Sequence, residues 1–325
     1  MKTQTGQEED RETERIGFLL VPGFSAMAFF SAVEPLRVAN RLSGRPLYSW
    51  RIYAQNGGTV AASNGMRLVA DEPFGAERPP TLIVCAGFGP ERAENKATLA
   101  TLRKFARAGV TLGALDTGAH VLARAGLLDG MRVSIHWEAA PAFQEEFPHI
   151  EVTGELFERQ ERIFTCAGGT AALDLMLAMI AARHGPVLAS AISEQFIHDR
   201  IRSSHDHQRM NLATRLHLKN DKVAQVIELM EGNIEHVLDV ETLAGAVSVT
   251  RRQLERLFSD SVRQSPARYY RDLRLTRARQ LLRQTALPVV QVAVATGFNS
   301  VSSLSRTYRE RFGLSPSADR HELPG

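Results

Sequence analysis

The stretch Leu254-Glu255-Arg256-Leu257-Phe258 returns later in the chain as Leu304-Ser305-Arg306-Thr307-Tyr308, and the pair Ser265-Pro266 returns as Ser315-Pro316. The spacing is about fifty residues, and self-similarity at a fixed spacing predicts two copies of one supersecondary unit. The sequence beyond Asp221 shows helical periodicity and no strand pattern. The last third of the protein is therefore predicted to be an all-α domain with an internal repeat.

The first copy has the start and stop signals of two helices joined by a turn. Asp239 is a good N-cap residue for a helix that runs through Ala246. Ser248 and Thr250 are expected in the turn, and the second helix is expected over residues 251–258. This pattern predicts a helix-turn-helix unit.

The second copy repeats these signals. Pro288 precedes a predicted helix over residues 289–295, and Gly297 is expected to make the turn. Ser300 is the predicted N-cap of a helix over residues 301–312. The chain is therefore expected to contain two helix-turn-helix units.

The second helix of each unit is predicted to present a polar and basic face. Arginine suits phosphate groups and guanine edges in a major groove. A helix over residues 266–283 would hold the units apart, so that both enter successive major grooves about 34 Å apart. An ordinary solvated helix face is the alternative, but repeat, charge and caps agree on DNA binding. The residues expected to contact DNA are Arg251, Arg252, Arg256, Ser302, Ser303 and Arg306.

The charge of the chain is distributed unevenly. The whole chain has a formal net charge of +3, but the segment from Arg251 to Gly325 contains 14 arginines, no lysine and 6 acidic residues. The residues before Arg251 are therefore net acidic. This distribution is typical of a basic DNA-binding segment attached to another domain.

The helical domain closely resembles the AraC/XylS family DNA-binding domain over about residues 221–320. The resemblance implies a sequence-specific transcription regulator whose partners are promoter DNA and RNA polymerase. The motifs that carry it are Leu243-Ala244, Leu254-Glu255-Arg256-Leu257-Phe258, Ser265-Pro266, Arg274-Leu275, Ala278-Arg279, Leu281-Leu282, Val292-Ala293, Gly297-Phe298, Leu304-Ser305-Arg306, Phe312-Gly313 and Ser315-Pro316.

The front part of the chain shows a different pattern, in which short apolar runs alternate with helical segments. Such alternation indicates an α/β fold with a parallel sheet. The carboxyl ends of parallel strands frame a ligand crevice, and glycine lets backbone amides approach a ligand closely. The runs predicted as strands are residues 16–21, 48–54, 81–86, 110–115 and 162–166.

Three of these runs end in small residues: Val21-Pro22-Gly23, Cys85-Ala86-Gly87 and Leu115-Asp116-Thr117-Gly118. A binding pocket is therefore expected where these strand ends meet. The two cysteines, Cys85 and Cys166, lack a CxxC pair or a Cys/His cluster. They are expected to be buried hydrophobic residues, with no metal site and no cofactor.

The front domain resembles the DJ-1/PfpI class of the glutamine amidotransferase-like superfamily, which implies a flavodoxin-like parallel sheet. Joined to the AraC-type domain, it resembles the GlxA-type regulators over almost the whole chain. The segments that carry this resemblance are Val21-Pro22-Gly23-Phe24, Thr117-Gly118-Ala119, Leu122-Ala123, Gly126-Leu127-Leu128-Asp129-Gly130 and His136-Trp137-Glu138.

The catalytic relatives place a nucleophilic cysteine on the sharp turn after a strand, and Asp116 occupies that position here. A carboxylate is a weak nucleophile toward carbonyl groups, so no catalytic residue is expected. The rival hypothesis is an active hydrolase or amidase fused to a DNA-binding module, with Cys85 or Cys166 as a displaced nucleophile. A second rival is a ligand-independent regulator whose front domain only dimerises.

The predicted role of the front domain is to sense a small molecule. A carboxylate beside aromatic rings suits a quaternary ammonium ion, held by cation-π attraction of roughly 0.5 to 2 kcal/mol per contact. The alternative structural reading has Asp116 capping the next helix and the aromatic rings in the core. The residues expected to bind the ligand are Phe24, Phe88, Asp116, Thr117, Gly118, His136, Trp137 and Glu138.

Among GlxA-type regulators, the Asp-Thr-Gly turn together with Ile135-His136-Trp137-Glu138 looks most like those that control glycine betaine or carnitine catabolism. Relatives that sense arginine are the nearest rival. The resemblance thus implies a ligand-responsive regulator, expected to be an activator and a homodimer.

The expected domain organisation is a sensing domain over residues 15–201, a linker over 202–220 and the DNA-binding domain over 221–320. The linker begins with a polar patch in which His205 and His207 are expected to be solvated rather than metal ligands. No apolar run reaches the roughly 20 residues that a membrane span needs. The polar start of the chain shows no secretion signal, so a cytoplasmic location is expected.

Overall fold

The computed structural model describes residues 13–93, 95–209, 220–285 and 287–321. The chain divides into two compact units, residues 1–208 and 209–325, and each is described by itself. Most of the expected linker, residues 210–219, lies outside the described residues. Among the described helices, none is long and apolar enough to cross a membrane.

The front unit is built on a seven-stranded sheet with the strand order β10-β11-β7-β6-β1-β2-β5. All neighbouring strands run parallel except β10, which pairs antiparallel with β11. The five predicted runs are all strands of this sheet, so the predicted α/β fold is confirmed. The strands are β1 (Glu14–Leu20), β2 (Tyr48–Ala54), β5 (Glu72–Pro73), β6 (Thr81–Cys85), β7 (Thr111–Leu115), β10 (Phe157–Gln160) and β11 (Ile163–Cys166).

The strands that the sequence did not reveal are short and lie at edges or in separate ribbons. They span only two to four residues each and lack a continuous apolar run. Their pairing is decided by the chain around them rather than by their own pattern. Besides β5 and β10 they are β3 (Thr59–Ala61), β4 (Arg67–Val69), β8 (Arg132–Ser134) and β9 (Glu151–Thr153).

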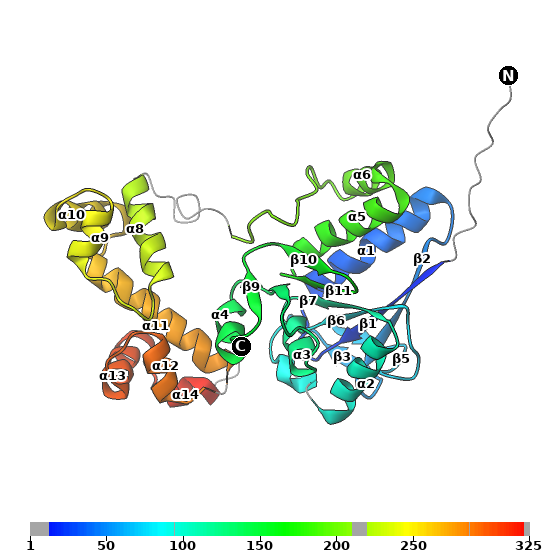
Figure 1. Cartoon of the computed structure of the whole chain (residues 1–325), viewed down its shortest axis with the longest axis horizontal. Helices are drawn as coiled ribbons and strands as arrows, with labels where there is room; N and C mark the ends of the chain where they lie inside the picture. Colours follow the sequence, from blue (N-terminus) through cyan, green and yellow to red (C-terminus); the bar gives the residue numbers. More distant parts are fainter. Residues whose placement is uncertain (1–12, 94, 210–219, 286, 322–325) are drawn as a thin grey trace, which may run out of the picture. The chain divides into compact units, whose positions relative to one another are not determined.

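Helices cover both faces of the sheet, which makes three layers (Figure 1). On one face, Phe18 and Leu20 of β1 pack with buried residues of α1 (Ala26–Ser43) and α5 (Ala171–His184), beside α6 (Pro186–Gln195). On the other face, Leu19 packs with α2 (Lys96–Arg107) and α3 (Gly118–Arg124). Alternate residues of a buried strand thus supply two separate cores. The remaining short helices of this unit are η1 (Pro90–Ala93) and α4 (Ala140–Glu146).

The last helix of the front unit, α6, stops at Gln195, before the predicted end of the sensing domain at residue 201. Ile197 then adopts a left-handed backbone with φ 55°, which a helix cannot contain. The following residues are bound to the front unit: Arg202 contacts Asp174, and Gln208 contacts Ile135. The front unit therefore extends to residue 208 rather than 201, and the first part of the expected linker belongs to it.

The second unit is entirely helical in its described part, and the sequence signals locate its helices closely. Asp239 accepts a hydrogen bond from the Thr242 N–H at 2.7 Å, and Ser300 accepts one from the Ser303 N–H at 3.1 Å, as N-caps do. The helices are α8 (Asp221–Gly232), α9 (Val240–Ala246), α10 (Arg251–Val262), α11 (Pro266–Gln284), α12 (Val289–Ala295), α13 (Val301–Phe312) and α14 (Pro316–His321).

A buried carboxylate joins three helices of this unit, α11, α13 and α14. Asp319 of α14 is fully buried and accepts hydrogen bonds from Tyr308 Oη of α13 at 2.6 Å, Arg279 Nε of α11 at 2.7 Å and Arg283 of α11 at 2.5 Å. Burial acts to raise the pKa of Asp319, but the hydrogen bonds from Tyr308 and the two arginines outweigh it, so the pKa is lowered. The carboxylate thus stays ionised and fixes α13 against α11.

Removal of this carboxylate is expected to destabilise the helical unit selectively. Asp319→Ala leaves two arginines without their shared anion, and such a loss costs about 3 kcal/mol. Unfolding of the full chain in urea measures this by far-ultraviolet circular dichroism. Both tryptophans, Trp50 and Trp137, lie in the front unit, so the tryptophan fluorescence transition should not move. Asp260→Ala, which removes an exposed acid, is the control; equal effects of the two variants would contradict the prediction.

Candidate functional site

The second helix of the first repeat, α10, presents a basic face. Leu254 and Phe258 are buried, whereas Arg251, Arg252 and Arg256 are exposed, as the sequence predicted. Thr250 and Gln253 form a reciprocal capping box at the start of this helix. The cap fixes where α10 begins and therefore which side its arginines occupy.

Arg251 differs from the other two arginines of this face. Its guanidinium group donates to Glu241 of α9 at 2.7 Å and to Glu255 at 3.0 Å. These carboxylates raise the pKa of Arg251 and also neutralise its charge locally. Arg251 therefore offers less attraction to a phosphate group than Arg252 or Arg256, a difference that the sequence alone did not show.

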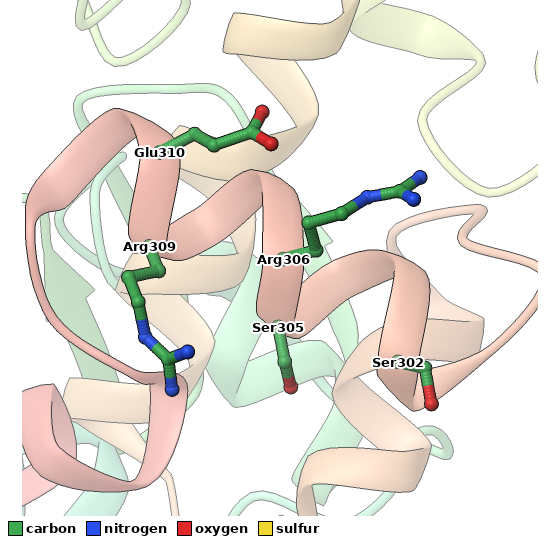
Figure 2. Close-up of a pocket in the computed structure, with 5 residues that line it drawn as sticks. All are labelled: Ser302, Ser305, Arg306, Arg309 and Glu310. Atoms are coloured by element: carbon green, nitrogen blue, oxygen red, sulfur yellow. The ribbon is translucent and has the colours of Figure 1, made fainter.

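The second helix of the other repeat, α13, carries a shallow hollow lined by polar side chains (Figure 2). Arg306 was predicted to contact DNA, and Ser302 joins it at the hollow. Ser303 is only partly exposed, and its N–H is used by the Ser300 cap. The sequence analysis did not name Glu310. The five lining residues are Ser302, Ser305, Arg306, Arg309 and Glu310.

The arginine Arg274 of α11 fixes the turn between α12 and α13. It donates to the carbonyl oxygens of Thr296 and Gly297 at 2.7 and 2.5 Å, and its guanidinium lies 4.3 Å from the Phe298 ring centre. Gly297 has φ 67°, and a Cβ there would lie 2.7 Å from the carbonyl oxygens of Ile234 and Glu235. The turn that precedes α13 thus depends on a glycine and on a half-buried arginine.

In the front unit, Asp116 lies on the sharp turn between β7 and α3. It has φ 60°, a left-handed conformation that is uncommon outside glycine. Its N–H donates to the Cys166 carbonyl of β11 at 2.9 Å. A Cβ on Gly168 would lie 2.7 Å from the Asp116 Cβ. The strained turn is therefore held in place by close packing against the end of β11.

The Asp116 carboxyl group has a polar but poorly hydrated environment. Burial raises its pKa to about 7, and the charge of Glu138 adds to this rise. Hydrogen bonds from the Thr117 N–H and the Ser25 hydroxyl oppose it. The charge of Glu138 thus acts on Asp116, and a cation bound near Asp116 would offset this repulsion.

Other predicted residues take different positions around this group. The Thr117 hydroxyl donates to the Gly87 carbonyl at 2.6 Å, so it ties two strand ends together. His136 Nδ1 accepts from the Glu138 N–H at 3.4 Å, and its ring lies 5.5 Å from that of Trp137. Burial lowers the pKa of His136. Trp137 and Phe88 are 40% and 54% exposed, so both rings are accessible.

Two further predicted residues are buried. Phe24 is 0% exposed, and its ring packs edge-on against Phe29 in the core. A Cβ on Gly118 would lie 2.3 Å from the Val84 carbonyl oxygen. Gly118 therefore allows α3 to pack against β6.

Ser25 was not among the predicted ligand-binding residues. It is the N-cap of α1, where its Oγ accepts from the Ala28 N–H at 3.3 Å, and its hydroxyl also bonds to Asp116. The signal was present, because serine before a helical pattern marks a cap. Only the fold shows that this cap meets the turn after β7.

Neither cysteine has the properties of a nucleophile. Cys85 and Cys166 are both buried. Burial raises the pKa of Cys85 well above its usual range and that of Cys166 to about 12. Both groups are therefore thiols at neutral pH, whereas a thiolate is the attacking species. The structure supplies no support for a displaced nucleophile at these two residues.

Comparisons with known proteins agree with this architecture. The DJ-1/PfpI family matches residues 14–182, and a helix-turn-helix domain matches residues 243–322. The HTH-type transcriptional regulator CdhR of Pseudomonas aeruginosa is 54% identical over 94% of this chain and 91% of its own length. The HTH-type transcriptional regulator GbdR of the same species is 45% identical over 97% of this chain and 86% of its own length.

A solved AraC family transcriptional regulator from Pseudomonas putida superimposes with a TM-score of 0.52 at 30% identity, over 56% of this chain and 99% of that one. A ThiJ/PfpI family protein from Pseudomonas syringae gives a TM-score of 0.52 at 22% identity, over 71% of this chain and 93% of that one, and so shows the fold alone.

A DJ-1/PfpI unit followed by two helix-turn-helix units with basic faces defines a DNA-binding transcription regulator. The chain belongs to the DJ-1/PfpI family and, within it, to the regulators that carry an AraC-type DNA-binding domain. Its matched full-length relatives are named as regulators rather than enzymes, in agreement with the expectation that the front unit is not catalytic.

Arg256 and Arg306 form no ion pair with the described residues, and they are expected to matter more for DNA binding than the ion-paired Arg251. Arg256→Ala and Arg306→Ala should each weaken binding by about 1 to 3 kcal/mol if they contact bases. Arg251→Ala should have a smaller effect, because Glu241 and Glu255 already hold its charge. Fluorescence anisotropy with a duplex selected from a random library measures all three. Unchanged affinity in both Arg256→Ala and Arg306→Ala would refute this docking of α10 and α13.

Proposed function

We propose that this regulator senses a small amine or quaternary ammonium compound, of the glycine betaine or carnitine kind, in a non-catalytic site around Asp116. The observation that carries the proposal is the buried Asp116 carboxyl group, which lies on a strained turn and whose pKa the charge of Glu138 raises further. The raised pKa of Asp116 reflects an unfavourable burial of negative charge. A bound cation would offset that cost, so the site favours positively charged ligands.

Exposed aromatic rings support the same ligand class. Trp137 follows His136 and precedes Glu138 in the chain, and Phe88 follows Gly87, whose carbonyl is bonded to Thr117. A quaternary ammonium ion has no N–H to donate, so its recognition depends on carboxylates and on aromatic faces. The site would thus select its ligand by charge and shape rather than through hydrogen bonds donated by the ligand.

Arg92 supports a zwitterion in preference to a simple cation. It lies on η1, and its guanidinium donates to the Pro22 carbonyl at 3.5 Å. A Cβ on Gly23 would lie 3.4 Å from its Nη1. The same turn leads directly into Ser25, which bonds to Asp116. A ligand whose ammonium faces Asp116 can therefore direct a carboxylate toward Arg92.

The remaining parts of the proposal concern partners. We propose that the ligand-bound protein activates transcription at promoters through RNA polymerase, and that two copies pair through the front unit. Exposed apolar side chains on α1, Met27 at 60% and Phe30 at 36%, support a pairing face there. For this activation, the ligand must bind the arrangement that is competent for DNA binding more tightly than it binds the other arrangement.

Calorimetric titration tests the sensing proposal directly. Glycine betaine, carnitine, dimethylglycine, choline and arginine are the probes, and Asp116→Ala is the variant. Saturable binding of one compound, lost in Asp116→Ala, is the expected result. Absence of binding by all five would favour a front unit that only dimerises, and turnover of a compound would favour a hydrolase.

The affinity for the bound cation is expected to rise with pH. A carboxyl group with a pKa of about 7 is mostly protonated at pH 6 and mostly ionised at pH 8, and only the ionised form attracts the cation. Affinity should therefore increase by up to roughly tenfold between these values. The rise should vanish in Asp116→Asn and persist in Glu145→Gln, an exposed acid of α4.

Arg92→Ala separates recognition of the two ends of the ligand. Loss of a charge-assisted contact to the carboxylate should weaken glycine betaine by about tenfold, a typical value for such a bond. Choline carries the same trimethylammonium group but no carboxylate, so its affinity should stay within about twofold. Equal losses for both compounds would show that Arg92 acts on the site in general rather than on the carboxylate.

A further inference from the structure

A segment that we term the strap, residues 196–208, connects the end of α6 to the end of the front unit. It contains no helix or extended strand, yet side-chain and backbone hydrogen bonds bind it to the front unit at two places. The contacts at its two ends are called the first and second anchors. The strap is the last part of the front unit before the chain continues toward the DNA-binding unit.

The first anchor is Asp174 of α5, which is 0% exposed. Its carboxylate accepts from His198 Nε2 at 2.9 Å, from the Arg202 N–H at 2.7 Å and from Arg202 Nη2 at 2.6 Å. Arg202 also donates to Thr170 Oγ1 at 2.8 Å. In these contacts, residues of the strap supply all the hydrogen bonds and positive charge that the buried carboxylate receives. Docking of the strap and burial of Asp174 therefore depend on each other.

The second anchor is Gln208, the last residue of the strap. Its Nε2 donates to the Ile135 carbonyl at 3.0 Å and to the Glu155 carbonyl at 2.9 Å, and its N–H donates to Gly154 at 3.4 Å. The Ser204 carbonyl accepts from the Leu156 N–H at 3.0 Å. The strap thus runs beside the segment 154–156 and ends against the start of the segment 135–138.

Both anchors are linked to the candidate ligand site by short segments of chain. Ile135 begins the segment that carries His136, Trp137 and Glu138, and the charge of Glu138 acts on Asp116. Thr170 lies two residues after Gly168, which packs against the Asp116 Cβ. Each anchor is thus only a few covalently linked residues away from the site. A movement of segment 135–138 or of segment 168–170 would therefore disturb a hydrogen bond of the strap.

Two features of the docked strap are energetically unfavourable. Ile197 is a β-branched residue with φ 55°, which is a sterically costly conformation, and its side chain is 94% exposed. The Oε1 atom of Gln208 is buried and accepts no hydrogen bond from the described residues. The strap is therefore suited to exist in a docked and a released arrangement with a small difference in free energy.

We propose that the strap is the coupling element of this regulator: occupation of the site moves the segment 135–138, releases Gln208 and so alters DNA binding by the second unit. This inference rests on the proposed function, because it assigns a role to the same site. Gln208 is a positioning residue in this scheme, since it contacts the wall of the site and not the ligand. A ligand that draws Glu138 toward Asp116 supplies the differential contact that such a shift requires.

A double-mutant cycle on DNA affinity tests the coupling without a ligand. Asp116→Asn removes the negative charge of Asp116, which a bound cation would neutralise, and Gln208→Ala removes the second anchor. Each single variant should change affinity for the selected duplex by about fivefold, at the lower end of allosteric coupling. The double variant should show no further change. Additive effects, or no effect of Asp116→Asn, would overturn the proposal.

Hydrogen exchange on the full chain provides a readout that a merely structural role would not move. Backbone amides of residues 198–208 should exchange at least tenfold faster in both Gln208→Ala and Asp116→Asn, with the amides of β6 and β7 unchanged. Asp199→Asn, an exposed change within the strap, is the matched control and should leave exchange and DNA affinity as in the wild type. Faster exchange in Gln208→Ala alone would mean that the strap does not respond to the site.

Titration with glycine betaine separates failure of this inference from failure of the proposed function. Gln208→Ala should bind glycine betaine within about twofold of the wild type, but the compound should no longer alter its DNA affinity. If glycine betaine alters DNA affinity equally in both proteins, the strap is not the coupling element. If it does not bind the wild type, the proposed ligand is wrong, and the double-mutant cycle still decides the role of the strap.

Discussion

Close backbone packing where β6, β7 and β11 end is the constraint on which the front unit depends. Asp116 keeps its left-handed conformation because Gly168 lets the end of β11 approach its Cβ, and because Gly118 lets α3 approach the carbonyl of Val84. Side chains at either glycine would push these elements apart. The same crowding buries the carboxyl group of Asp116, which explains why its pKa is raised and why the site suits a cation.

The two copies of the repeat in the helical unit stabilise the same helix contact by different interactions. Phe258 and Tyr269 of the first copy form an edge-on aromatic pair with ring centres 5.9 Å apart. The positions fifty residues later hold Tyr308 and Asp319, which form a hydrogen bond of 2.6 Å. The contact between the helices is kept while its nature changes from apolar to charged. The carboxylate of the second copy also forms ion pairs with two arginines of α11. These ion pairs link α13 to the helix that lies between the two helix-turn-helix units.

Much of this architecture could be predicted, because it follows from local signals. The caps Asp239 and Ser300, the turn at Gly297 and the alternation of apolar runs located the helix-turn-helix units and the parallel sheet. The end of α6 could not be predicted, because Asp174, far earlier in the chain, binds His198 and Arg202 and so directs the residues after Gln195. A long-range contact overrides local propensity there.

The sequence by itself determined the two-part organisation, the DNA-binding class and the replacement of a nucleophile by Asp116, because each is written in residue type and spacing. Tertiary structure alone decided which of the predicted residues act together. It placed Ser25 and Glu138 beside Asp116, moved the ring of Phe24 into the core and paired Arg251 with two acids. The physical reason is that burial and charge environment depend on residues distant in sequence, which no local pattern encodes.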